Sequence, residues 1–146
     1  MILLSHIVAG SVVSRAHLAP AVLIVLSLAV HYLLDTVPHT QAPTDEGYRP
    51  NRKTYFFITL DLVASGLYLW WFWARFGFSC VNFLVILASI FPDLIDVTRY
   101  QKWFYKTFRF YYDFHDRLQR ETRKPIGSIT QIVLIVSCIA FLVVTR

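Results

Sequence analysis

Long apolar runs dominate the chain and predict membrane-spanning helices. A helix needs about 20 apolar residues to cross the hydrocarbon core of a bilayer. Four runs reach this length, and a shorter apolar stretch over about residues 1–14 precedes them. The four runs extend from about Leu18 to Val37, Tyr55 to Phe76, Ser79 to Val97 and Ile126 to Thr145. We therefore predict an all-α integral membrane bundle of four to five transmembrane helices, forming a single domain over residues 1–146.

The connection before the last run has a different pattern. Apolar and aromatic residues recur at steps of three and four between about residues 99 and 124, and Lys and Arg occupy the other face. This pattern predicts one amphipathic helix that lies in the plane of the membrane interface. The recurring positions are Tyr100, Phe104, Phe108, Tyr111, His115 and Leu118.

The composition agrees with a membrane protein. The chain is 56% hydrophobic and 16% charged, whereas soluble domains carry about 25% charged residues, and its mean hydropathy is +0.51. The only two cysteines, Cys80 and Cys138, lie in separate apolar runs. They are too few for a disulfide framework or a thiolate zinc site.

The basic residues are distributed unevenly, and this predicts the orientation. If the runs alternate across the bilayer, the loop at 38–54 and the helix at 99–124 lie on one side, with eleven of the fourteen Lys and Arg residues. Cytoplasmic loops carry such an excess. We therefore expect an integral protein of a bacterial or archaeal inner membrane, with this end facing the cytoplasm. Arg15, Arg75 and Arg146 are the three basic residues on the other side.

Carboxylates and imidazoles gather at the same end of several runs. An ionised carboxylate at membrane depth costs at least a few kcal/mol, so carboxylates from three spans are expected to face one another or a shared cation. His31 and Asp35 are four residues apart and share one helix face. By helical rise, His6 reaches a depth similar to that of His31. The candidate set comprises His6, His31, Asp35, His39, Asp61, Asp93, Asp96 and His115.

This combination of side chains favours a divalent metal. Imidazole and carboxylate without thiolate suit zinc, and also manganese or iron. Eight such residues fit one or two ions together with the groups that orient the ligands. Three alternatives stay open at this point. One alternative to a metal site is that the cluster is a structural hydrogen-bond network or a proton path. A second is that Asp96 is a helix cap, and a third is that His39 is a loop residue.

Several short motifs, in order along the chain, resemble a known family. "SHIVAG", "HYLLDTVPH", "FPDLID", "FHDRLQ" and "PIGSITQ" are similar to motifs of the YdjM-like membrane-bound metal-dependent hydrolases. The sequence pattern of this family is in turn similar to that of zinc-dependent phospholipase C, a helical enzyme with a metal cluster. The resemblance implies that His6, His31, Asp35, Asp93 and His115 are metal ligands. It leaves His39 and Asp61 as further candidate ligands.

Together these features predict a membrane-embedded hydrolase. The chain has no G-x-S-x-G motif, Cys–His pair or P-loop, so a metal-activated water is the expected nucleophile. Asp61 or Asp96 would accept its proton. A phosphoester is the expected substrate, above all a lipid headgroup, because basic residues near the surface attract anionic lipids by about 1 kcal/mol each.

Two other classes of protein remain as alternatives. Buried His and Asp residues also line the paths of metal-ion and proton transporters. A non-catalytic structural membrane protein with a polar cluster is the third class. A nucleic-acid partner is not expected, because the aromatic residues of the basic helix are better explained by a membrane interface.

Overall fold

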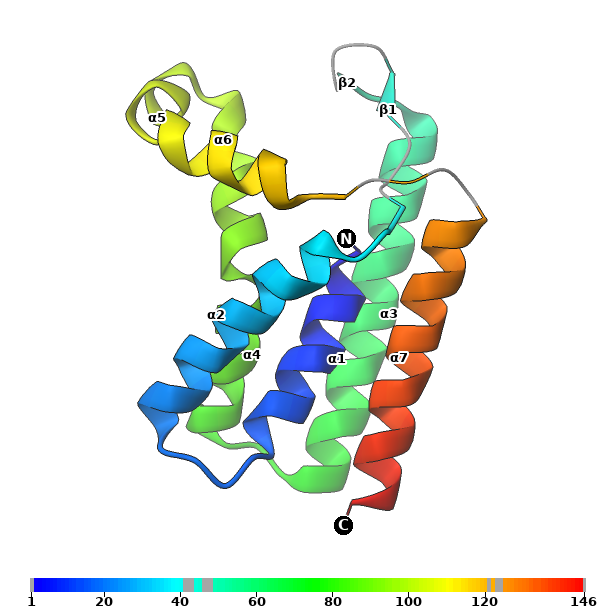
Figure 1. Cartoon of the computed structure of the whole chain (residues 1–146). Coiled ribbons are helices and arrows are strands. Elements are labelled where there is room, and N and C mark those ends of the chain that lie inside the picture. The colour runs from blue at the N-terminus through cyan, green and yellow to red at the C-terminus, as the bar shows by residue number, and fades with distance from the viewer. Residues whose placement is uncertain (1, 41–43, 46–48, 121, 123–124, 146) are drawn as a thin grey trace.

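The chain folds as a bundle of helices joined by mostly short connections (Figure 1). The computed structural model describes residues 2–40, 44–45, 49–120, 122 and 125–145. The predicted all-α bundle is confirmed, with one small antiparallel pair of two-residue strands in the loop before α3. The elements are α1 (Leu3–Ser14), α2 (Pro20–Thr36), β1 (Thr44–Asp45), β2 (Arg49–Pro50), α3 (Arg52–Phe76), α4 (Cys80–Asp96), η1 (Val97–Tyr100), α5 (Lys102–Thr107), α6 (Arg109–Leu118) and α7 (Ile126–Val144).

Three helices in the described part of the chain are long and apolar enough to cross a membrane. They are α3, α4 with its extension to Arg99, and α7. Their outer surfaces expose large apolar side chains, such as Leu67, Trp70 and Val136, as expected for an integral membrane protein. The predicted run at 18–37 folds as the 17-residue α2, which is about 25 Å long and falls short of the bilayer core.

The short helix α1 packs against α2, α3, α4 and α7 and is buried on nearly every side (Figure 1). Small residues allow these close approaches. A Cβ atom on Gly10 would lie 2.5 Å from the Oγ atom of Ser89 on α4, so only glycine fits there. The Ser11 hydroxyl donates a 2.8 Å hydrogen bond to the Ile7 carbonyl, which satisfies a polar group that burial would otherwise penalise.

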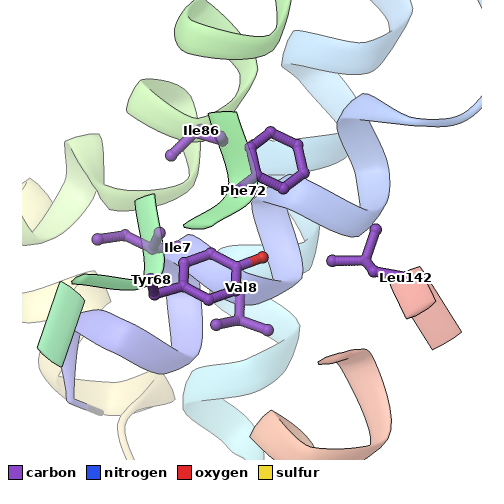
Figure 2. Close-up of a cluster of buried hydrophobic side chains, with 6 residues drawn as sticks. All are labelled: Ile7, Val8, Tyr68, Phe72, Ile86 and Leu142. Atoms are coloured by element: carbon purple, nitrogen blue, oxygen red, sulfur yellow. The ribbon is translucent and has the colours of Figure 1, made fainter. Parts of the chain in front are cut away.

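The apolar core lies between α1 and the helices α3, α4 and α7. Figure 2 shows its side chains meeting around α1. Lipid tails are as apolar as the core itself, so the hydrophobic effect does not drive membrane helices together. Close packing and its dispersion contacts hold them together instead. The six buried members are Ile7, Val8, Tyr68, Phe72, Ile86 and Leu142.

A glycine turn sets the relative direction of α3 and α4. Gly77 ends α3 with a φ of 77°, a conformation that glycine adopts without strain. Its N–H donates to the Trp73 carbonyl at 2.9 Å. The helices α3 and α4 diverge from this turn towards the other end of the bundle (Figure 1).

The prediction of one amphipathic helix over residues 99–124 is wrong. The described part of that segment forms η1, α5 and α6 instead, with breaks at Gln101 and Phe108. The breaks turn α6 so that two tyrosines reach α4 and η1. Tyr111 donates to the Pro92 carbonyl at 2.8 Å, and the Tyr112 and Thr98 hydroxyls are 2.8 Å apart.

The α5–α6 segment still has the surface expected at a membrane interface. It lies across one end of the bundle (Figure 1). Its outer face is aromatic and basic, with Trp103 68% exposed and Phe110 85% exposed, and Arg109 is also exposed. The last predicted residues of the segment, 121 and 123–124, lie outside the described residues.

Candidate metal centre

The last turns of α2 supply two of the candidate ligands. His31 and Asp35 are both fully buried, and the Nε2 atom of His31 lies 3.2 Å from Oδ2 of Asp35. One helical turn separates the two residues, so their side chains project from the same face. The structure thus places them as the spacing predicts.

A backbone carbonyl of α4 fixes the orientation of the His31 ring. The Nδ1 atom of His31 lies 2.7 Å from the Ser89 carbonyl oxygen. A carbonyl only accepts, so Nδ1 carries the proton and donates it. When Nε2 carries no second proton and binds no cation, its lone pair points at the Asp35 carboxylate. Metal-ligating histidines are commonly oriented in this way, through a hydrogen bond from the other ring nitrogen.

The third candidate ligand comes from the central helix α1. The ring of His6 stacks on that of His31, with centroids 4.2 Å apart. Its Nε2 atom lies 3.4 Å from Oδ1 of Asp35 and 3.6 Å from Oδ2 of Asp93. The stretch at residues 1–14 therefore reaches the same depth as the end of α2, as its helical rise predicts.

The fourth candidate ligand, Asp93, comes from the last turn of α4. One ligand atom from each of His6, His31, Asp35 and Asp93 lies within 4.8 Å of the other three. These four residues, termed the ligand group below, can hold a metal ion. Two imidazoles and two carboxylates form a donor set that zinc, manganese and iron accept. The two negative charges would balance one divalent cation.

His115 of α6 closes one side of the ligand group. Its Nε2 atom lies 3.0 Å from Oδ2 of Asp35 and 3.4 Å from Nε2 of His31. Burial alone would lower the pKa of His115, but its contacts with Asp35 and Asp96 outweigh burial and raise that pKa to about 9. These distances place His115 beside the ligand group, in contact with Asp35 and His31.

Asp96 lies next to His115, at the end of α4. Its Oδ1 atom is 3.5 Å from Nδ1 of His115. Arg99 forms an ion pair with Asp96 and, at 2.8 Å, with Asp116 of α6. Asp96 therefore faces the site through His115, and its charge is balanced by a neighbouring guanidinium.

Asp61 occupies a different place from the ligand group. Its two carboxylate oxygens accept hydrogen bonds from the backbone N–H groups of Leu3 at 2.7 Å and Leu4 at 3.1 Å. These N–H groups begin α1 and have no partner within the helix, and the positive end of the helix dipole favours a carboxylate there. Asp61 therefore anchors α1 to α3, whereas its catalytic role stays a prediction.

His39 is fully buried but lies outside the ligand group. Its backbone N–H donates to the Arg120 carbonyl at 3.1 Å, and its carbonyl accepts from the Thr122 N–H at 2.9 Å. Its Nδ1 atom donates to the Val37 carbonyl at 2.9 Å, which leaves Nε2 as an acceptor. Burial lowers the pKa of His39, so its neutral form is favoured, and its role as a ligand stays a prediction.

Two features of the site were missed by sequence reasoning. The Ser89 carbonyl orients His31, while the Ser89 hydroxyl donates to Ile86 at 2.6 Å. A backbone acceptor leaves no signal in the sequence. The ion pair from Arg99 to Asp96 did leave one, because the two residues are three positions apart at a helix end.

No protein-family profile, curated protein sequence or solved structure matches this chain. The case for a function therefore rests on the side chains of the site themselves.

Proposed function

We propose that this protein is a membrane-embedded metal-dependent hydrolase that acts on phosphoesters, above all lipid headgroups, at the cytoplasmic leaflet. The observation that carries the proposal is the ligand group, in which three helices bring two imidazoles and two carboxylates within 4.8 Å of one another. Buried carboxylates are expensive in a membrane, and a bound cation is the simplest group to offset that cost.

Zinc is the metal we favour, with one or two ions per chain. The ligand group contains no thiolate, and its mixed nitrogen and oxygen donors leave manganese and iron as alternatives. His115 contacts the ligand group and Asp96 contacts His115, and we propose that these two residues and His39 offer donors for a second ion. Cysteines do not compete, since Cys80 begins α4 at the end opposite Asp93, about 20 Å away along the helix.

The chain's own residues are arranged to handle a proton near the ligand group. A bound divalent cation would supply Lewis acidity and lower the pKa of a water towards 7. Of the two predicted proton acceptors, we favour Asp96, because it contacts His115 and lines the neighbouring cavity. The Asp61 carboxylate also lines that cavity, but both of its oxygens already accept backbone N–H groups.

The alternative function, ion or proton transport, requires a polar path to the far end of the bundle. Serines do lie deeper on α1, α2 and α4, and several of their hydroxyls donate to backbone carbonyls. Ser27 donates to the Val85 carbonyl at 2.8 Å, and Ser14 donates to the Ser11 carbonyl at 2.8 Å. Such bonds stabilise helix packing and favour the hydrolase over the transporter.

Hydrolysis of a water-soluble phosphodiester tests the proposal. We expect detergent-purified protein with Zn²⁺ or Mn²⁺ to cleave bis(p-nitrophenyl) phosphate and EDTA to abolish cleavage. His31→Ala and Asp35→Asn should lower the rate more than about 100-fold, since even indirect partners of a metal site cost 10- to 100-fold. The matched controls His17→Ala and Asp113→Asn change exposed residues and should keep the rate. Equal rates in all four variants would contradict the proposal.

A further inference from the structure

A cavity of about 520 Å³ adjoins the ligand group, at the end of the bundle where α3 and α4 diverge (Figure 1). Its volume lies in the range of small-molecule sites, about 300–1,000 Å³. Residues of α1, α3, α4 and α7 line it, together with the ends of two connections. The lining residues are Ile2, Leu3, Thr40, Phe57, Ile58, Asp61, Leu62, Asp93, Asp96, Val97, Gln119, Ser128 and Gln131.

One wall of the cavity is polar and is shared with the ligand group. Asp93 belongs to both the ligand group and this wall, and its side chain is 24% exposed. Gln131 also lines the cavity. It donates to the Thr40 carbonyl at 2.9 Å and accepts from the Thr40 hydroxyl at 3.2 Å. The Ser128 hydroxyl lies 3.3 Å from the same Thr40 hydroxyl. This network gives the wall a fixed set of polar atoms.

Three apolar residues of α3 form another wall of the cavity, which Asp61 of the same helix interrupts. Phe57, Ile58 and Leu62 are 38%, 45% and 55% exposed, so the wall continues onto the outer surface of the helix. Since α3 is long and apolar enough to span the membrane, that outer surface faces lipid tails. The cavity therefore joins the bilayer interior to the ligand group.

The charges of the lining residues indicate which ligands the cavity would bind. Among the lining residues that the structure describes, Asp61, Asp93 and Asp96 are acidic and none is Lys or Arg. A phosphate group would be repelled by this wall unless a cation stood between them. Binding of an anionic headgroup here should therefore depend on metal.

From these observations we infer that the cavity takes a lipid phosphoester sideways from the bilayer. Its headgroup would lie against Asp93 and its acyl chain against Phe57, Ile58 and Leu62. The inference rests on the proposed function for the choice of a phosphoester, and it adds the route of entry and the residues that select for an acyl chain. A water-soluble phosphoester would lack the second set of contacts.

Alkylation of an introduced cysteine tests the inference without depending on hydrolysis. In a Cys80→Ser, Cys138→Ala background, Leu62→Cys places a thiol in the cavity. Leu60→Cys is the matched control, because Leu60 is exposed on the same helix and does not line the cavity. Ile58→Cys is a second cavity variant should Leu62→Cys fail to fold. The probes are dihexanoylphosphatidic acid and, as its chain-free counterpart, glycerol 3-phosphate, each with Mn²⁺ and N-ethylmaleimide.

We expect the lipid to protect the cavity thiol by about tenfold when its concentration is about ten times its dissociation constant. Glycerol 3-phosphate should protect neither thiol, and the control thiol should stay reactive throughout. EDTA or Asp93→Asn should abolish protection. Equal protection at the two positions, no protection at the cavity position, or protection that survives EDTA would overturn the inference.

The two proposals can fail separately. Metal-dependent protection of the cavity thiol without cleavage of any phosphoester would uphold the lipid site and refute the hydrolase. Cleavage of bis(p-nitrophenyl) phosphate without protection would uphold the hydrolase and refute the lipid site.

Discussion

Adjacent residues of α1 face different environments. His6 points into the ligand group with His31 and Asp35, whereas Ile7 and Val8 belong to the apolar core shown in Figure 2. The core lies between α1 and the helices α3, α4 and α7, and the other members of the ligand group come from α2 and α4. A short central helix therefore separates a region that holds the bundle together from a region suited to bind a cation.

The two regions contribute to stability in opposite ways. Core side chains stabilise the bundle by close packing, and their truncation leaves a cavity. Buried carboxylates and imidazoles carry a desolvation cost that neighbouring charges offset only in part. Substitutions in the core should therefore lower stability and leave metal binding intact. Substitutions in the ligand group should lower metal binding and leave stability intact.

The largest expected effect on stability is in the core. Phe72 is fully buried, so Phe72→Ala should lower the free energy of unfolding by about 3 kcal/mol. Thermal unfolding in detergent measures this, and metal content per folded chain should stay at the wild-type value. The control is Trp70→Ala, since Trp70 lies on the same helix and is 71% exposed. Loss of metal at full stability in Phe72→Ala would mean that the two regions are not separate.

A smaller effect is expected where the two regions meet, at Asp61. Asp61→Ala removes the acceptor for the first N–H groups of α1 and should cost about 1 kcal/mol, as loss of a helix cap does. Displacement of α1 should also move His6 and weaken metal affinity by about tenfold. Titration of the metal and thermal unfolding measure the two effects.

Asp61→Asn is the matched control, because an amide oxygen can still accept one N–H bond. It should restore most of both the metal affinity and the stability. An Asp61→Ala protein with wild-type stability and metal affinity but no hydrolysis would instead assign Asp61 a direct catalytic role.

Much of the site follows from helical spacing and depth. The spacing of His31 and Asp35 and the depths of His6 and Asp93 predict that these side chains can meet, and the structure brings them together. Both signals depend only on helix geometry, which tertiary contacts change little.

The spacing and depth of residues do not determine how each helix is rotated about its own axis. Asp61 has a suitable depth, yet its carboxylate meets the start of α1 instead of the ligand group. The periodicity of residues 99–124 predicted the face of His115 but not the breaks at Gln101 and Phe108. Tyr111 and Tyr112, which follow the second break, bond to Pro92 and Thr98, and contacts between residues so far apart along the chain leave no local signal.

Metal content of the purified protein tests the central claim most directly. Detergent-purified chains would be loaded with Zn²⁺, desalted and analysed by mass spectrometry, with Asp35→Asn beside Asp113→Asn. The account predicts about one or two ions per chain in the wild type and in Asp113→Asn, and less than about one-tenth of that in Asp35→Asn. A metal-free wild type, or an Asp35→Asn protein with the wild-type metal content, would contradict it.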